Sequence, residues 1–148
     1  MKVISEPHAR VEPTSLAGKE RDTLGLTWEE RRWVRRRLTT VRGREVALAL
    51  PTGSVLHAGQ ILAVEPEWYL EVESVPEPVI AVFPRDHVES LRLAFEVGNR
   101  HFSLALEPDA LLVPDDPAME QLLTRLGVRW ERRTAVFNPI GAAHAHEP

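Results

Sequence analysis

Histidine is the side chain in this sequence with the widest range of possible chemistry, because the 148 residues include six histidines and no cysteine. A cysteine nucleophile, a disulfide framework and a thiolate zinc site are therefore excluded, and a metal ion would need nitrogen or oxygen ligands. His101 stands out because it follows Gly98-Asn99-Arg100, where a helical pattern changes into an alternating strand pattern. A structural role, a catalytic base and a metal ligand are all open for it.

The other histidines fall into two groups. His144 and His146 are separated by one residue near the C-terminus, which is a spacing that can bring two imidazole nitrogens to one ion. His8, His57 and His87 lie in a polar segment, beside a turn and in the first turn of a helix, respectively. We expect these three to be surface residues and not ligands.

The catalytic motifs that a sequence can reveal are missing. The chain contains no H-E-x-x-H, no G-x-S-x-G and no cysteine, and scattered serine, histidine and aspartate residues cannot establish a triad without geometry. The phosphate-binding pattern G-x-x-x-x-G-K-[ST] is missing as well, so we do not expect GTP hydrolysis. The sequence therefore favours a protein that is not an enzyme.

A helix is expected directly before His101. Asp86 with Glu89 three residues later is a helix-start signal, and Gly98 is expected to end the helix as a left-handed C-cap. Apolar residues recur at helical spacing, which predicts a face packed in the core. They are Val88, Leu91 and Phe95.

The remaining elements of the second half give the order β-α-β-β-α-β, which is the split βαβ pattern of ferredoxin-like domains. A second helix is predicted with Asp116 as its N-cap, Pro117 at its first position and a leucine-rich core face. The predicted strands are 79–83, 102–106, 110–113 and 128–137.

The first half reads as a small all-β unit, so the fold class is α+β. Thr27 and Glu30 form a capping-box pattern for one helical turn, and the predicted strands are 33–41, 44–50, 61–64 and 68–75. The run Val75-Pro-Glu-Pro78 stiffens the chain and marks a boundary. We therefore expect a β-rich domain at 1–75, a ferredoxin-like domain at 76–140 and a flexible tail at 141–148.

Charge and hydropathy narrow the range of partners. The net charge is −4, and the residues up to Val75 hold 11 basic and 11 acidic side chains, which argues against a nucleic-acid partner. No apolar run is long enough for a membrane span and no signal peptide is evident, so we expect a cytoplasmic protein. The arginine cluster is either a solvated face or a docking surface for an acidic partner. It comprises Arg31, Arg32, Arg35, Arg36, Arg37, Arg42 and Arg44.

Several stretches resemble the UreE family of urease accessory proteins over nearly the whole chain, from about Leu24 to the tail. They include LTWEERRWVRRRLTTVRGREVALALPTGSVLHAGQIL, LAFEVGNRHFSLAL, the leucine-rich helix with LG at its end, and VFNPIGAAHAHEP. The most specific motif is GNRH, because in that family its histidine binds nickel at the dimer interface. The corresponding residue in this sequence is His101.

The resemblance implies a nickel metallochaperone: a homodimer with an N-terminal peptide-binding-like β domain and a C-terminal ferredoxin-like metal-binding domain. Ni²⁺ would bind to His101 of both subunits, with Zn²⁺ or Cu²⁺ able to replace it. The implied partners are the urease accessory GTPase and the urease apoprotein complex. The alternative from a different class is a metal-free protein–protein interaction module that uses the arginine-rich β domain.

This sequence departs from the family pattern at three places. Some members have histidines just before the second helix, where this chain has Pro114-Asp115-Asp116-Pro117. Many members have a further histidine where this chain has Glu96, which either ligates through oxygen or is simply solvated, and we favour a solvated carboxylate. The long histidine tail of some members is reduced to His144 and His146. These two histidines either complete the metal shell or do nothing.

Overall fold

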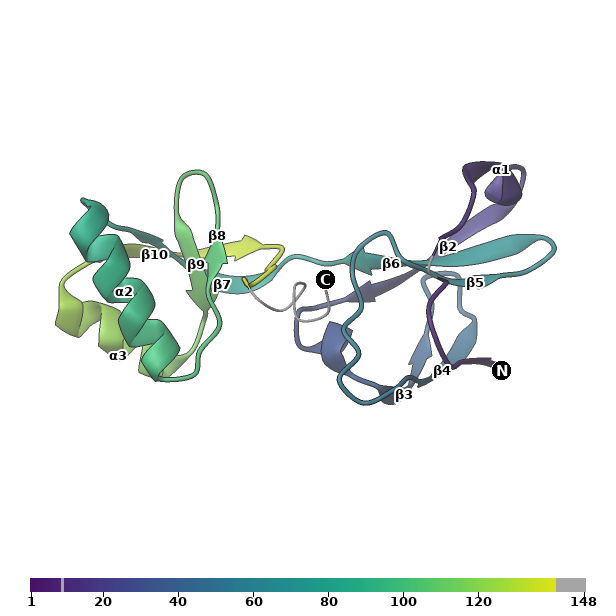
Figure 1. Ribbon diagram of the computed structural model, residues 1–148, viewed down its shortest axis with the longest axis horizontal. Coiled ribbons are helices and arrows are strands. Elements are labelled where there is room, and N and C mark those ends of the chain that lie inside the picture. The colour runs from purple at the N-terminus through teal and green to yellow at the C-terminus, as the bar shows by residue number, and fades with distance from the viewer. Residues whose placement is uncertain (9, 141–148) are drawn as a thin grey trace. The chain divides into compact units, whose positions relative to one another are not determined.

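The structure is a computed structural model that describes residues 1–8 and 10–140. Contacts divide the chain into two compact units, Met1–Val75 and Pro76–Pro148, and the segment 141–148 predicted as a tail lies outside the described residues. The α+β class, with a β-rich unit followed by a unit of one sheet and two helices, is confirmed (Figure 1). Within the described residues, no helix has the length and apolar character needed to cross a membrane.

The N-terminal unit consists of two three-stranded sheets. The first has the order β1 (Lys2–Ile4), β4 (Glu45–Ala49), β3 (Arg35–Thr39), and the second has the order β2 (Glu20–Leu26), β6 (Trp68–Ser74), β5 (Ile61–Val64). The pairs β1–β4 and β2–β6 are parallel, whereas β3–β4 and β5–β6 are antiparallel. Two short helical turns, α1 (Pro13–Leu16) and η1 (Glu30–Arg32), complete the unit.

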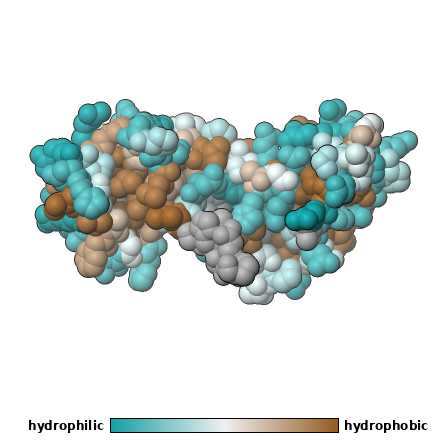
Figure 2. Space-filling model, turned by 45° about the horizontal axis from the view of Figure 1, so that its top comes forward, coloured by the Kyte–Doolittle hydropathy of each residue, from teal (hydrophilic) through white to brown (hydrophobic). Residues whose placement is uncertain are grey.

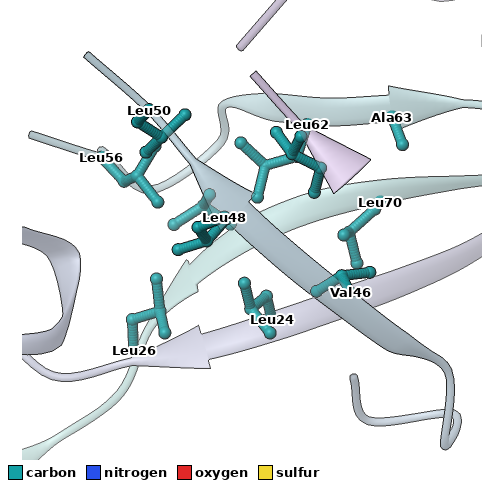
Figure 3. Close-up of a cluster of buried hydrophobic side chains, with 11 residues drawn as sticks. Leu24, Leu26, Val46, Leu48, Leu50, Leu56, Leu62, Ala63 and Leu70 are labelled. Carbon is teal, nitrogen blue, oxygen red and sulfur yellow. The ribbon is translucent and has the colours of Figure 1, made fainter. Parts of the chain in front are cut away.

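A leucine-rich core joins the two sheets (Figure 3). Val46 and Leu48 are buried and alternate along β4 with exposed Glu45 and half-buried Ala47 and Ala49; they face Leu24 and Leu26 of β2. Period-two alternation therefore buries one face of β4 and leaves the other face to the solvent. The capping box before η1 is confirmed, because the Thr27 N–H donates to the Glu30 carboxylate at 2.8 Å.

Asp22 forms a buried polar cluster beside this core. Its carboxylate accepts hydrogen bonds from the Thr40 hydroxyl (2.6 Å) and the Arg44 guanidinium (2.9 Å). It also accepts from the backbone N–H groups of Thr23 (2.9 Å) and Arg42 (3.1 Å). Burial alone raises the pKa of Asp22, but the hydrogen bonds outweigh burial and the pKa lies below its ordinary value.

The C-terminal unit is a four-stranded antiparallel sheet with two helices packed on one face (Figure 1). Its elements are β7 (Glu77–Phe83), α2 (His87–Asn99), β8 (Ala105–Leu106), β9 (Leu111–Pro114), α3 (Pro117–Leu126) and β10 (Arg129–Ala135). The strand order β10-β7-β9-β8 is that of a ferredoxin-like domain, as predicted.

The second helix matches the sequence prediction closely. The Asp116 carboxylate accepts from the Ala118 N–H at 2.8 Å, Pro117 is the first helical residue, and Gly127 ends α3 in a left-handed conformation. The strand predicted at 102–106 is shorter, because β8 contains two residues only. Phe102 and Leu104 instead pack against the core while the chain leaves α2.

The prediction that Val88, Leu91 and Phe95 pack in the core is wrong. Val88, Leu91 and Phe95 are 74%, 59% and 68% exposed, whereas Leu93 and Val97 are fully buried under the helix. At about 100° per residue, the two sets lie on roughly opposite sides of α2. The helix therefore has two apolar faces, of which a single chain buries one. Figure 2 shows apolar surface gathered on the C-terminal unit, at the left of the view.

Candidate metal site

The end of α2 differs from the prediction in a way that concerns His101 directly. Gly98 is not a left-handed C-cap, because the helix continues through Asn99 and its cap residue is Arg100. His101 takes the left-handed conformation instead, with φ of 61°, and it is the one non-glycine with positive φ among the described residues. The left-handed residue was expected at Gly98, and it occurs three residues later, at His101.

The hydrogen bonds at this helix end form a Schellman motif with histidine at the position that usually holds glycine. The His101 N–H donates to the Gly98 carbonyl at 2.9 Å, and the Phe102 N–H donates to the Val97 carbonyl at 3.2 Å. Phe102 and Val97 also belong to the same hydrophobic cluster, as the motif favours. The backbone on both sides of His101 is therefore held in place.

The His101 side chain is exposed and has no hydrogen bond or ion pair with any described residue. A left-handed conformation is unfavourable for most L-residues, although histidine, asparagine and aspartate adopt it more often than others. The structure thus holds an unengaged imidazole at a strained position on a rigid support. Strain of this kind at an exposed residue points to a function of its side chain.

Glu96 lies one helical turn before Arg100, and the two side chains form an ion pair. The Arg100 Nη1 lies 2.5 Å from Glu96 Oε2 and 3.0 Å from the Glu96 carbonyl oxygen. The carboxylate is therefore engaged with a guanidinium, and neither the solvated state that we favoured nor an oxygen ligand describes it fully. Binding of Glu96 to a metal ion would require this pair to open.

Of the other described histidines, only His87 belongs to the same unit as His101. His8 and His57 belong to the N-terminal unit. The His8 backbone N–H donates to the Ile61 carbonyl at 2.9 Å, and the His57 backbone N–H donates to the Gln60 side-chain carbonyl at 2.7 Å. His87 is the first residue of α2, whereas His101 follows the last turn, roughly 20 Å away at 1.5 Å per residue. His144 and His146 lie outside the described residues.

One chain therefore does not complete a metal site within its described part. No three histidine, aspartate or glutamate side chains of residues 1–8 and 10–140 converge so as to hold an ion. One exposed imidazole per chain fits a divalent transition metal as a nitrogen ligand, but it is at most a fraction of a coordination shell. An ion bound at His101 would need further ligands from outside the described residues of one chain.

The fold and this site define a two-domain protein whose ferredoxin-like unit presents, at a helix end, a histidine without a side-chain partner among the described residues. Residues 4–74 match the family described as "UreE urease accessory protein, N-terminal domain", and residues 77–148 match its "C-terminal domain". The chain belongs to the UreE family of urease accessory proteins, which confirms the resemblance. It is thus related to accessory proteins and not to urease itself.

Individual relatives give the same result. The urease accessory protein UreE of Deinococcus radiodurans is 42% identical, over 76% of this chain and 73% of its own length. That of Rhodobacter capsulatus is 37% identical, over 92% of this chain and 85% of its own length. That of Ralstonia nicotianae is 38% identical, and the matched region spans 55% of its length.

Proposed function

We propose that this protein is a nickel metallochaperone, which binds Ni²⁺ as cargo at a homodimer interface and delivers it for assembly of the urease active site. The observation that carries the proposal is His101, an exposed and unengaged imidazole held at a left-handed helix end. Membership of a family of urease accessory proteins supports the same role. The protein acts as a carrier and not as an enzyme.

The apolar outer face of α2 supports the homodimer. Val88, Leu91 and Phe95 are each more than half exposed and lie on one side of the helix. A second copy is a fitting cover, because a two-fold axis lets the same apolar face meet itself. Phe95 precedes His101 by six residues, or roughly 9 Å along a helix axis. We place the two-fold axis between Phe95 and the end of α2, where the two His101 side chains can share one ion.

The two imidazoles form an incomplete coordination shell whose remaining ligands can exchange, which suits a carrier that has to release its metal. A closed cage of four protein ligands retains its ion, whereas an incomplete set leaves positions for water or for the acceptor. His144 and His146 are further candidate ligands, and Glu96 is a weaker one because of its pair with Arg100. Zn²⁺ or Cu²⁺ can replace Ni²⁺, since affinity alone does not select nickel.

The proposed acceptors are a urease accessory GTPase and the urease apoprotein complex, in the cytoplasm. Partners have to supply the selection for nickel that a two-imidazole site lacks. They also supply the nucleotide chemistry, because this sequence has no G-x-x-x-x-G-K-[ST] pattern.

Equilibrium dialysis with ⁶³Ni²⁺, combined with analytical ultracentrifugation, tests this proposal. We expect one tight Ni²⁺ per dimer, and in His101→Asn a loss of affinity of about 100-fold with the dimer intact. Asparagine is the substitution of choice because it tolerates the left-handed backbone. The matched control is His87→Asn, which removes an exposed histidine from the opposite end of the same helix.

Two results contradict the proposal. Retention of tight nickel binding in His101→Asn would show that the metal binds elsewhere in the chain. If the unmodified protein bound no metal tightly, the alternative of a metal-free interaction module would replace the carrier.

A further inference from the structure

The arginine cluster of the N-terminal unit separates into two sets with different surroundings. Arg42 and Arg44 form ion pairs with Glu20 and Asp22, and the Arg31 side chain is buried and donates to the Leu26 carbonyl at 3.0 Å. These three arginines make contacts within the N-terminal unit that stabilise its fold. The other four have no carboxylate partner among the described residues: Arg32, Arg35, Arg36 and Arg37.

The four remaining arginines lie on β3 and just before it. Arg36 stacks over the Trp33 ring at 3.4 Å, and Arg32 stacks over the Trp28 ring at 4.6 Å. Arg35 and Arg37 are exposed and oppose Ala49 and Ala47 of β4, on the face that does not belong to the core. Positive charge is therefore concentrated along one strand and is not balanced within the described chain.

β3 is also an edge strand, because it pairs with β4 on one side only (Figure 1). The Leu50 N–H donates to the Val34 carbonyl, and the Thr40 N–H donates to the Arg44 carbonyl, so even-numbered residues bond to β4. Alternation then directs the N–H and carbonyl groups of Arg35, Arg37 and Thr39 toward the open edge. These groups form a row that can pair with one more strand.

A hollow of about 230 Å³ lies against the same strand and can receive side chains of an added strand. Its walls include the Trp33 ring, the Arg36 guanidinium and Leu38. Two glutamates line the hollow as well: Glu30, and Glu45 where it opposes Thr39. An added strand therefore meets positive charge beside Arg35 and Arg37 and negative charge within the hollow.

We propose that the β3 edge binds an extended acidic segment of another protein as a fourth strand of the sheet. Its backbone pairs with the free N–H and carbonyl groups of β3, and its carboxylates pair with Arg35 and Arg37. A second copy of this chain is a poor occupant, because antiparallel pairing of two β3 strands sets arginines against arginines. Nucleic acid lacks the backbone groups that extend a sheet, and the unit has no surplus of positive charge.

The test uses the full-length protein and a fluorescein-labelled octapeptide in which glutamate alternates with valine. We expect saturable binding that weakens with salt, and shifts in the NMR signals of the Arg35, Arg37 and Thr39 amides. Arg35→Gln/Arg37→Gln should raise the peptide Kd by about tenfold. The matched control Arg92→Gln/Arg125→Gln removes two exposed arginines from the C-terminal unit and should leave the Kd unchanged.

Two further probes separate sheet extension from simple charge attraction. A peptide with N-methyl groups on alternate residues keeps its carboxylates but cannot complete the ladder, so its binding should be lost. A single-stranded oligonucleotide of equal charge should not compete. The proposal is overturned by equal binding of the N-methylated peptide, by equal competition from the oligonucleotide, or by the absence of peptide binding. Shifts of the β3 amides on dilution of the protein alone would point to a second copy and overturn it too. Nickel binding does not enter this test, so its outcome is independent of the proposed carrier function.

Discussion

Replacement of His101 by glycine should stabilise the C-terminal unit while it removes the proposed ligand. The φ of 61° at His101 places an L-residue in the left-handed region, where glycine is favoured by about 1–2 kcal/mol. Glycine also gains freedom in the unfolded chain, which opposes the effect by about 0.4–1 kcal/mol. The imidazole has no contact that would be lost, because it is exposed and unengaged with the described residues. We therefore expect a net stabilisation of about 0.5–1 kcal/mol.

Calorimetry at fixed protein concentration, with a chelator present, measures this change without any contribution from metal. The expected rise in Tm is roughly 3–6 °C for a unit of this size. Hydrogen exchange at the amides of Leu93 and Val97 assigns the change to α2, where both residues are buried. Nickel affinity of the same variant should fall as it does in His101→Asn.

The matched control is Asn99→Gly, two residues earlier in the same helix end. Asn99 is exposed and helical, so glycine there should destabilise the unit by about 0.3 kcal/mol, the difference between the helix propensities of asparagine and glycine. The two substitutions are thus expected to have opposite signs. If His101→Gly lowered the Tm as Asn99→Gly does, the left-handed strain at His101 would not be the determining factor.

Two further predictions concern the two units separately. Phe95→Lys should dissociate the proposed dimer, with a rise in its dissociation constant of about 100-fold, and should weaken the proposed nickel binding with it. Thr124→Lys on α3 should change neither. Sedimentation velocity measures the dimer, and an intact Phe95→Lys dimer would exclude this face as the interface. The hydrogen bonds of Asp22 hold its pKa below the ordinary 3.8, so they stabilise the fold above about pH 4 and this stabilisation is lost as pH falls through the folded pKa. Asp22→Asn should therefore cost about 2 kcal/mol at pH 7 and progressively less toward pH 3, measured from urea midpoints, and a difference that did not change with pH would contradict this role.

Local signals in the sequence predicted much of the fold correctly. The caps at Thr27, Asp86 and Asp116 are formed as expected, because each depends on residues within three positions. The β3–β4 hairpin and the order of elements in the C-terminal unit also follow from local patterns. The sequence prediction missed β2, since this strand begins with charged residues and pairs in parallel with β6, far along the chain.

The candidate site shows where local reasoning ends. The sequence did not predict the left-handed conformation of His101, because Gly98 gave the stronger local signal for a helix end. The spacing of Val88, Leu91 and Phe95 correctly identified an apolar face of α2. The prediction that this face is buried was wrong, because all three residues are exposed. Periodicity reveals which side of a helix is apolar, whereas what covers that side depends on the rest of the chain and on other copies. The ion pair of Glu96 with Arg100 agrees with i,i+4 spacing and could have been anticipated from it.

The parallel pairing of the N-terminal unit has a consequence for its synthesis. Residues Glu20–Leu26 of β2 pair with Trp68–Ser74 of β6, so β2 has no strand partner until almost the whole unit has left the ribosome. At about 5–20 residues per second, the 48 positions between paired residues take roughly 2–10 s to translate. During that interval the apolar residues that later form the core, Leu24 and Leu26 among them, are open to chaperones. The topology therefore makes β2 wait for β6, so the order of translation differs from the order in which this unit can fold.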